Sequence, residues 1–174
     1  GNDFIAAASF ERGALWVASS THLFLRAGDA GFVDRSDNCP TDLTAMWAMG
    51  TGELELWGAR TGGGVLARSL PSGTGCRERR DVGGPLVAIV GFPGVGTNDY
   101  VGVRENGDVW RWRPGEPPLI SPTNLSDDVS FRALHGQSRT QLIAVGSLDV
   151  NGSPRARAWL LGADGGWQEE RPLG

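Results

Sequence analysis

The side chains best suited to catalysis are few in this sequence, and they are scattered along it. His22 and His135 are the only histidines in 174 residues, and neither belongs to a nucleophile motif such as Gly-x-Ser-x-Gly. His135 lies in an apolar run where a bound ligand could reach it, but a hydrogen-bonded histidine in a crowded interior is the competing interpretation. We therefore expect a protein that is not an enzyme and that uses no cofactor.

Two short segments resemble ligand-binding loops without completing them. Asp149–Ser153 has the alternating oxygen ligands of a calcium loop but lacks the distal acidic residue that completes such a site. Gly91–Gly96 is glycine-rich, yet a strand and not a helix is expected to follow it, so no helix N-terminus is available to bind phosphate. The sequence predicts ordinary turns at both places and no metal site.

Tryptophan and arginine are the strongest candidates for recognition, because they anchor many protein interfaces and stack on sugars. Trp110 and Trp112 alternate with two arginines, so a strand there would carry two rings on one face and two guanidinium groups on the other. Arg155, Arg157 and Trp159 would share one face of a later strand. The candidate binding residues are therefore Trp110, Trp112, His135, Arg155, Arg157 and Trp159, with packing in the core as the alternative for the rings.

Cys39 and Cys76 are the only cysteines, too few for a disulfide scaffold, and neither has a second ligand at metal-binding spacing. They are candidates for one disulfide between neighbouring repeats, and two free buried thiols are the alternative. All sixteen basic residues are arginine, which fits codon usage in a GC-rich bacterial genome. We expect an extracytoplasmic or secreted protein. The sequence begins at Gly1 and not at methionine, so a targeting signal can have been lost from it.

Composition limits the class of partner. The formal net charge of -4 argues against nucleic acid, because phosphate binding needs a concentrated excess of basic residues on one face. No apolar run approaches the roughly 20 residues that span a bilayer, so we expect no membrane insertion. The 27 glycines and 10 prolines fall between apolar runs, where they predict turns.

The clearest structural signal is a predicted β-hairpin over residues 98–114, in which two strand-like runs flank the turn-forming pair Asn106-Gly107. Similar hairpins recur along the chain. Four first-strand runs each open on an apolar residue and place alanine third, at offsets of 39, 43 and 45 residues. They are Phe4–Ser9, Leu43–Ala48, Leu86–Gly91 and Phe131–Gly136. A small residue at one fixed place is expected where inner strands approach closely.

Three further strands are expected in each repeat. A bulky-then-small pair marks the second strand at steps of 40, 44 and 44 residues, ending at Ala18, Gly58, Gly102 and Gly146. A third strand and a less regular outer strand follow. The sequence therefore predicts an all-β fold, a β-propeller with four blades of four antiparallel strands, since no helical periodicity persists for ten residues. A β-sandwich is the rival fold, but it does not require one small residue in each quarter of the chain.

The repeats resemble the degenerate bacterial propeller blades of the tectonin, RCC1-like and sialidase-like families. The resemblance rests on Val101-Gly102 and Gly107–Trp110, and on turns such as Ala163–Trp167 that resemble an Asp box without its leading serine. Such short motifs imply a fold and leave the activity open.

We expect one propeller domain over residues 1–174, with blades at approximately 1–42, 43–85, 86–128 and 129–174. Three arrangements remain open: a closed four-bladed ring, half of a larger ring completed by a second copy, or part of a longer ring. An open ring would expose the flat faces of its end blades.

Three functions follow from this prediction. The first is a non-enzymatic scaffold or binding module for protein–protein interaction or self-association, so that a protein partner or a second copy is expected. The second is a tectonin-type lectin, which would make carbohydrate the ligand. The third, a propeller hydrolase or lyase, would need carboxylates and histidines clustered on the inner strands, where only His135 is titratable.

Overall fold

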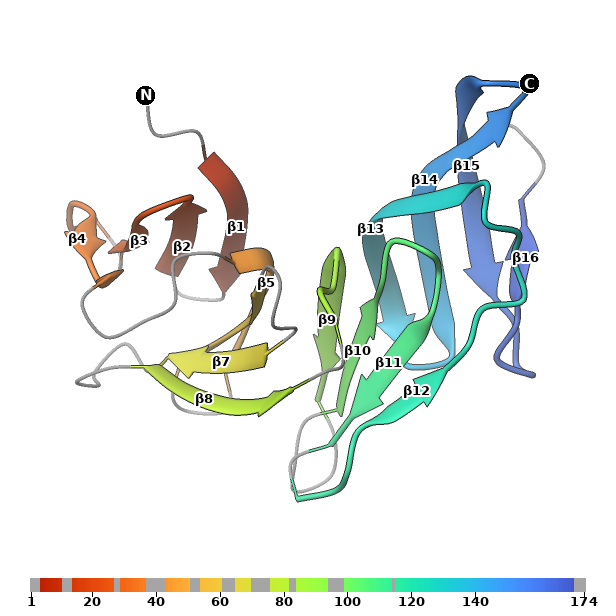
Figure 1. Cartoon of the computed structure of the whole chain (residues 1–174). Coiled ribbons are helices and arrows are strands. Elements are labelled where there is room, and N and C mark those ends of the chain that lie inside the picture. Colours follow the sequence, from red (N-terminus) through yellow and green to blue (C-terminus); the bar gives the residue numbers. More distant parts are fainter. Residues whose placement is uncertain are drawn as a thin grey trace. The chain divides into compact units, whose positions relative to one another are not determined.

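A computed structural model describes residues 4–10, 14–26, 29–36, 43–50, 54–60, 65–69, 76–81, 84–93, 99–113 and 115–170 (Figure 1). Over these residues the fold is all-β, as predicted, and the strands form four antiparallel sheets of four strands each. Within each sheet the strands follow the order of the chain, so every connection joins neighbouring strands. No helix that could span a membrane is found among the described residues.

The chain divides into two compact units, Gly1–Leu86 and Val87–Gly174. The first unit holds two sheets whose first strands, β1 and β5, pack against each other. One sheet contains β1 (Phe4–Phe10), β2 (Ala14–Ser19), β3 (Leu23–Arg26) and β4 (Val33–Asp34). The other contains β5 (Leu43–Gly50), β6 (Leu54–Arg60), β7 (Val65–Ser69) and β8 (Cys76–Asp81).

The second unit also holds two sheets, and their first strands, β9 and β13, pack side by side (Figure 1). One sheet contains β9 (Ala88–Phe92), β10 (Asp99–Val103), β11 (Val109–Trp112) and β12 (Leu119–Ser121). The other contains β13 (Val129–Ser138), β14 (Gln141–Val150), β15 (Ser153–Leu161) and β16 (Trp167–Glu169). Each of the four sheets lies within one of the predicted blade ranges. Whether they form a single domain stays a prediction.

The repeated alanine marks an equivalent place in the backbone of each sheet. In three sheets the register shifts by one residue immediately before it, between Phe4 and Ala6, Leu43 and Ala45, and Phe131 and Ala133. Such a shift is a β-bulge, which bends and twists the strand. In the fourth case β9 begins at Ala88 itself, and the preceding Val87 amide donates to the Val103 carbonyl at 2.9 Å. The repeated alanine of the first strand therefore marks an equivalent backbone position in all four sheets.

The surroundings of this alanine differ from sheet to sheet, contrary to the prediction of a uniformly crowded position. Ala45 is buried, Ala88 is half-buried and Ala133 is exposed. The reason is packing, because Ala133 lies on a sheet face that no described residue of the second unit covers. The repeated alanine therefore coincides with the bulge, and its burial differs from sheet to sheet.

The bulky-then-small pair predicted for the second strand does not occupy an equivalent position in all four sheets. Opposite the fourth residue of the first-strand run lie Val17, Gly58, Gly102 and Ala144. The sequence had predicted Ala18 and Gly146 at this position, together with Gly58 and Gly102. A pair of bulky and small residues recurs by chance in glycine-rich strands, and only the hydrogen-bond register distinguishes the alternatives.

The predicted hairpin at residues 98–114 is present as β10 and β11, but its turn is longer than two residues. The Arg104 carbonyl accepts a hydrogen bond from the Gly107 amide at 3.0 Å, and Gly107 has φ +91°. This is a four-residue turn closed by a left-handed glycine, a common hairpin loop. The Asn106 side chain accepts from the Asp108 amide at 3.1 Å, which stabilises the loop.

The core of the second unit lies between its two sheets. It is built from branched residues of β10 and β11 and from larger side chains of the last sheet: Val101, Val103, Val109, Phe131, Leu134, Leu142, Trp159 and Trp167. Phe131 contacts both indoles, with ring centroids 5.0 Å from Trp159 and 4.9 Å from Trp167. Burying such side chains contributes about 1.5–3 kcal/mol each, so this layer fixes the two sheets together.

Candidate functional site

The sheet β13–β16 presents one buried face and one exposed face. Cross-strand partners place Ala133, Val145 and Ala158 in one row and His135, Ile143 and Leu160 in the next, all on the same side of the sheet. We call these six side chains the open face. Val145 is 44% exposed and Leu160 is 41% exposed, and both are large apolar residues. None of the six is a lysine, arginine, aspartate or glutamate.

The opposite side of this sheet packs toward β9–β12. Leu134, Ala144 and Trp159 are buried there in consecutive cross-strand positions. The Trp167 indole nitrogen donates to the Gly107 carbonyl at 2.9 Å, which ties β16 to the loop between β10 and β11. The Asn124 amide adds two hydrogen bonds to the backbone of Trp167, at 2.7 and 3.0 Å. The sheet is therefore held on one side only by the described residues of its unit.

The predicted Arg/Trp face of β15 has the alternation that was expected, but it belongs to the buried side of the sheet. Trp159 is 1% exposed, so its ring is part of the core. Arg157 lies nearer the edge, where its guanidinium pairs with the Glu169 carboxylate at 2.7 Å. Arg155 is exposed. The open face is instead formed on this strand by Ala158 and Leu160.

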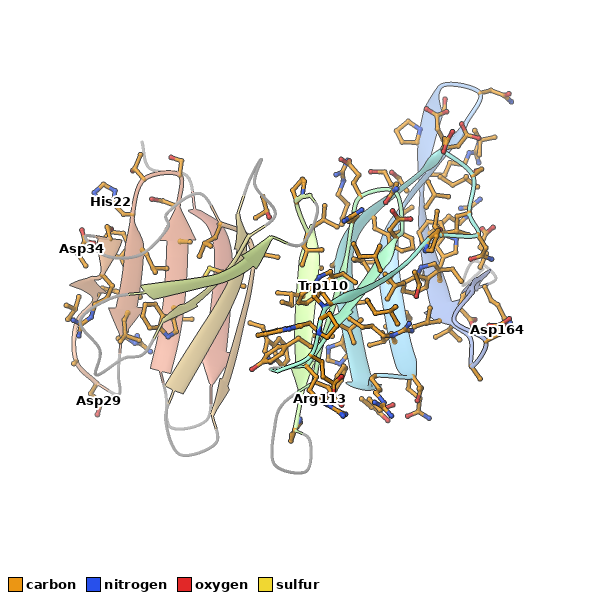
Figure 2. All side chains as sticks on the ribbon, turned by 60° about the horizontal axis from the view of Figure 1, so that its bottom comes forward. His22, Asp29, Asp34, Trp110, Arg113 and Asp164 are labelled. Atoms are coloured by element: carbon orange, nitrogen blue, oxygen red, sulfur yellow. The ribbon has the colours of Figure 1, made fainter. Side chains whose placement is uncertain are left out.

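Trp110 and Trp112 are also buried, at 0% and 5% exposure. Their rings form a series with Tyr100, with centroids 5.8 Å apart for Tyr100 and Trp112 and 6.2 Å apart for the two indoles. Figure 2 shows Trp110 well inside its sheet and Arg113 near the sheet's end. Packing, the alternative that the sequence left open for these rings, is what the structure shows.

His135 lies on β13, the first strand of its sheet, as predicted, and its side chain is exposed on the open face. Its cross-strand partner is Ile143, so it stands beside apolar neighbours. Cys39 lies outside the described residues, and of Cys76 only the backbone in β8 is described. The disulfide stays a prediction.

The loop that resembled a calcium site is a hairpin turn. Asn151 and Gly152 have φ of 56° and 77°, and the Asp149 carboxylate accepts from the Gly152 amide at 2.6 Å. This left-handed pair is typical of a two-residue hairpin turn. Among the described residues, no group of three His, Cys, Asp or Glu is placed to hold a metal ion.

Comparison with known proteins places the chain by fold. No protein-family model matches it, and a search of curated proteins finds no match. Among solved structures it is similar to YCF48 bound to a D1 peptide, with a TM-score of 0.58 and 16% identity over 99% of this chain. It is also similar to the fission yeast SREBP–SCAP binding domains, with a TM-score of 0.54 and 14% identity over 94% of this chain.

A third similar structure is the extracellular domain of the one-component system BT4673 from B. thetaiotaomicron, with a TM-score of 0.56 and 14% identity over 95% of this chain. The match covers 54%, 59% and 22% of these three proteins respectively, so the chain spans about half the length of the first two. YCF48 is a β-propeller. The likeness shows that the fold is β-propeller-like.

Proposed function

We propose that this chain is a non-enzymatic binding module, a four-bladed portion of a β-propeller that a second copy of the chain completes through the open face of β13–β16. The observation behind this proposal is the open face itself, an uncharged and largely apolar sheet surface at the end of a unit built by packing sheet on sheet.

Packing within the second unit supports the choice of occupant. There the sheet β9–β12 covers the other side of β13–β16 with branched side chains, among them Val101, Val103 and Val109. The open face offers the same kind of surface, with alanine, valine, isoleucine and leucine side by side across β13, β14 and β15. Another sheet of the same repeat is the surface that fits it best, because aligned β-sheets pack through interdigitating side chains. A second copy supplies such a sheet.

The absence of charge on the open face favours this association. Burying a lysine or glutamate without a partner would cost several kcal/mol, whereas the six side chains of the open face carry no permanent charge. The open face therefore brings no unpaired charge of its own to the contact with a sheet of the second copy.

The structural neighbours are consistent with a role in binding. YCF48 is bound to a D1 peptide, the fission yeast structure is a complex of binding domains, and the chain corresponds to 54% and 59% of those two proteins. At 16% identity or less, these neighbours support the fold and only suggest that a propeller of this kind serves a protein partner.

Light scattering tests the proposal by comparing the mass of the wild-type chain with that of a variant that carries a charge on the open face. We expect the wild-type chain to have about twice the 18.4 kDa mass of one copy. Val145→Asp should have the mass of one copy at the same concentration, because an unpaired carboxylate would be buried at the contact. Circular dichroism should show the same strand content for both proteins.

Val33→Asp is the matched control, because Val33 is 48% exposed on the short outer strand β4 of the first unit and is not one of the six residues of the open face. This variant should keep the wild-type mass. A compact wild-type monomer would contradict completion by a second copy and favour a closed four-bladed ring. Equal loss of the dimer in both variants would show that the open face has no special role.

The lectin alternative would rely on exposed aromatic rings, which stack on sugars. Among the described side chains Phe32 is such a ring, 51% exposed. The six tryptophans whose side chains are described are buried or half-buried. They are Trp16, Trp47, Trp110, Trp112, Trp159 and Trp167. Binding of carbohydrate stays a prediction that a glycan array would test.

A further inference from the structure

A pocket of about 200 Å³ opens between the two sheets of the second unit, away from the open face. It lies where β10 begins and β11 ends, and the turn between β13 and β14 reaches it from the neighbouring sheet. Its charged walls are Asp99 on β10, Arg111 and Arg113 on β11, Glu116 after β11, and Arg139 in that turn. Three guanidinium groups thus face two carboxylates, which leaves an excess of one positive charge.

Asp99 and Arg113 neutralise each other within the pocket. The guanidinium of Arg113 donates to both carboxylate oxygens of Asp99, at 2.7 and 3.1 Å. This fork-shaped pairing lowers the pKa of Asp99 and raises that of Arg113. Arg139 stands 3.7 Å from the same carboxylate, and its side chain is 60% exposed. Asp99 therefore pairs with two arginines, of which Arg139 has the longer contact, and Glu116 lies 3.6 Å from Arg113 as a second carboxylate.

Arg111 is the least compensated of the three. It is half-buried, and it donates a hydrogen bond to the Ser121 hydroxyl at 3.4 Å, a long contact with a neutral group. Among the described residues, no carboxylate lies within ion-pair distance of it. Burial first, and then the charge of Arg139, lower its pKa, although a guanidinium remains protonated at any physiological pH. An anion between Arg111 and Arg139 would relieve this repulsion.

The geometry points to a site for the carboxylate of a peptide, held by Arg111 and Arg139 in this pocket. A guanidinium fork matches a planar carboxylate, and charge-assisted bonds of this kind are stronger than neutral ones. The site is smaller than the 300–1,000 Å³ typical of pockets for drug-sized ligands, so it has room for one side chain or one chain end.

Two features favour a peptide over a free organic acid. The pocket is open to solvent, and Leu119, 62% exposed at its rim, offers an apolar contact for the residue that carries the carboxylate. Leu119 pairs with Arg111 across β11 and β12, so the apolar and cationic groups lie next to each other. This site extends the proposed binding function by naming a chemical class of partner, and it does not depend on the open face.

Affinity selection on the full chain tests this site with two matched pools of hexapeptides. Both pools are acetylated and randomised over Ala, Ser, Leu and Phe; one ends in a free carboxylate and the other in an amide. Mass spectrometry of the retained peptides should show about tenfold or greater preference for the free carboxylate, the ratio expected of one charge-assisted contact. Glutarate, titrated by calorimetry, provides the comparison with a small organic acid.

Arg111→Gln and Arg139→Gln should abolish the preference, and Arg111→Lys should restore part of it. Arg139 lies in an exposed turn, so its variant tests the site even if Arg111→Gln fails to fold. Arg155→Gln is the matched control, because Arg155 is an exposed arginine outside the pocket, and it should keep the preference.

Equal retention of the two pools, or a preference that survives in both glutamine variants, would overturn the assignment. If glutarate bound through Arg111 and neither peptide pool were preferred, the assignment of a peptide ligand would be wrong. The ligand would then be a small organic acid. The selection is repeated on Val145→Asp, which should retain the preference. Failure of the dimer and failure of this site are therefore separate results.

Discussion

The indole nitrogen of Trp167 shows how one residue holds the two sheets of the second unit together. It donates to the buried carbonyl of Gly107, sixty residues away in the sequence. Trp110 is equally buried, yet its indole nitrogen has no hydrogen-bond partner. The two tryptophans therefore bury similar rings and differ in whether the ring also bonds to the neighbouring sheet.

We expect Trp167→Phe to lower the free energy of unfolding by about 1–2 kcal/mol more than Trp110→Phe. Both changes shrink a buried ring, but only the first leaves a buried carbonyl without its donor. Urea unfolding followed by circular dichroism measures the difference. Equal losses in the two variants would mean that the Trp167 hydrogen bond makes no net contribution.

The pairing of β13 with β14 depends on close backbone contact at the bulge. Gly146 lies opposite Phe131, where the register shifts before Ala133. A Cβ atom at Gly146 would lie 2.1 Å from the Ser130 carbonyl oxygen and 2.8 Å from the Phe131 Cα. Both neighbours are backbone, so the strands themselves would have to move apart.

Gly146→Ala should therefore destabilise the chain by about 2–3 kcal/mol, because overpacking against backbone forces a shift of the pair of strands. Gly31→Ala is the control, since no atom lies within 4 Å of the added Cβ and its φ is unremarkable. We expect that control to change stability by less than about 0.5 kcal/mol. Thermal unfolding of both variants makes the comparison, and a neutral Gly146→Ala would show that β14 tolerates displacement at the bulge.

At the scale of the whole molecule, completion of the ring by a second copy would link folding stability to protein concentration. Because association removes native chains from the unfolding equilibrium, a roughly hundredfold rise in concentration should raise the midpoint of thermal unfolding by about 3–5 °C. Val145→Asp should show no such rise. Scanning calorimetry over that range checks this, and a wild-type midpoint independent of concentration would argue for a monomer.

The number and order of strands were accessible from the sequence because their signals are local. Glycine and proline separate the runs, and alternation within each run gives a strand whichever sheet it joins. The alanine of the first strand also marked an equivalent backbone position, since a bulge is set by a few neighbouring residues. The position predicted for the bulky-then-small pair of the second strand was wrong in the first and last sheets, because the register of a strand depends on its partner strand.

The binding candidates show where sequence reasoning stopped. The alternation of Arg155, Arg157 and Trp159 was correct, yet a strand does not specify which of its faces meets the next sheet. That choice placed Trp159 in the core and Val145 and Leu160 on the open face. The pocket was missed altogether, although the alternation of Arg111 and Arg113 was the one signal that pointed to it.

The sequence by itself determined an all-β chain of repeated four-strand units, because strand alternation and turn residues act over a few positions. Only the tertiary structure decided which faces are buried and that Asp99, Arg111 and Arg139 share one pocket. Those three residues come from separate strands and a distant turn, and they meet only because two sheets pack against each other. Packing between sheets depends on contacts among residues from the whole unit, so no local sequence pattern predicts it.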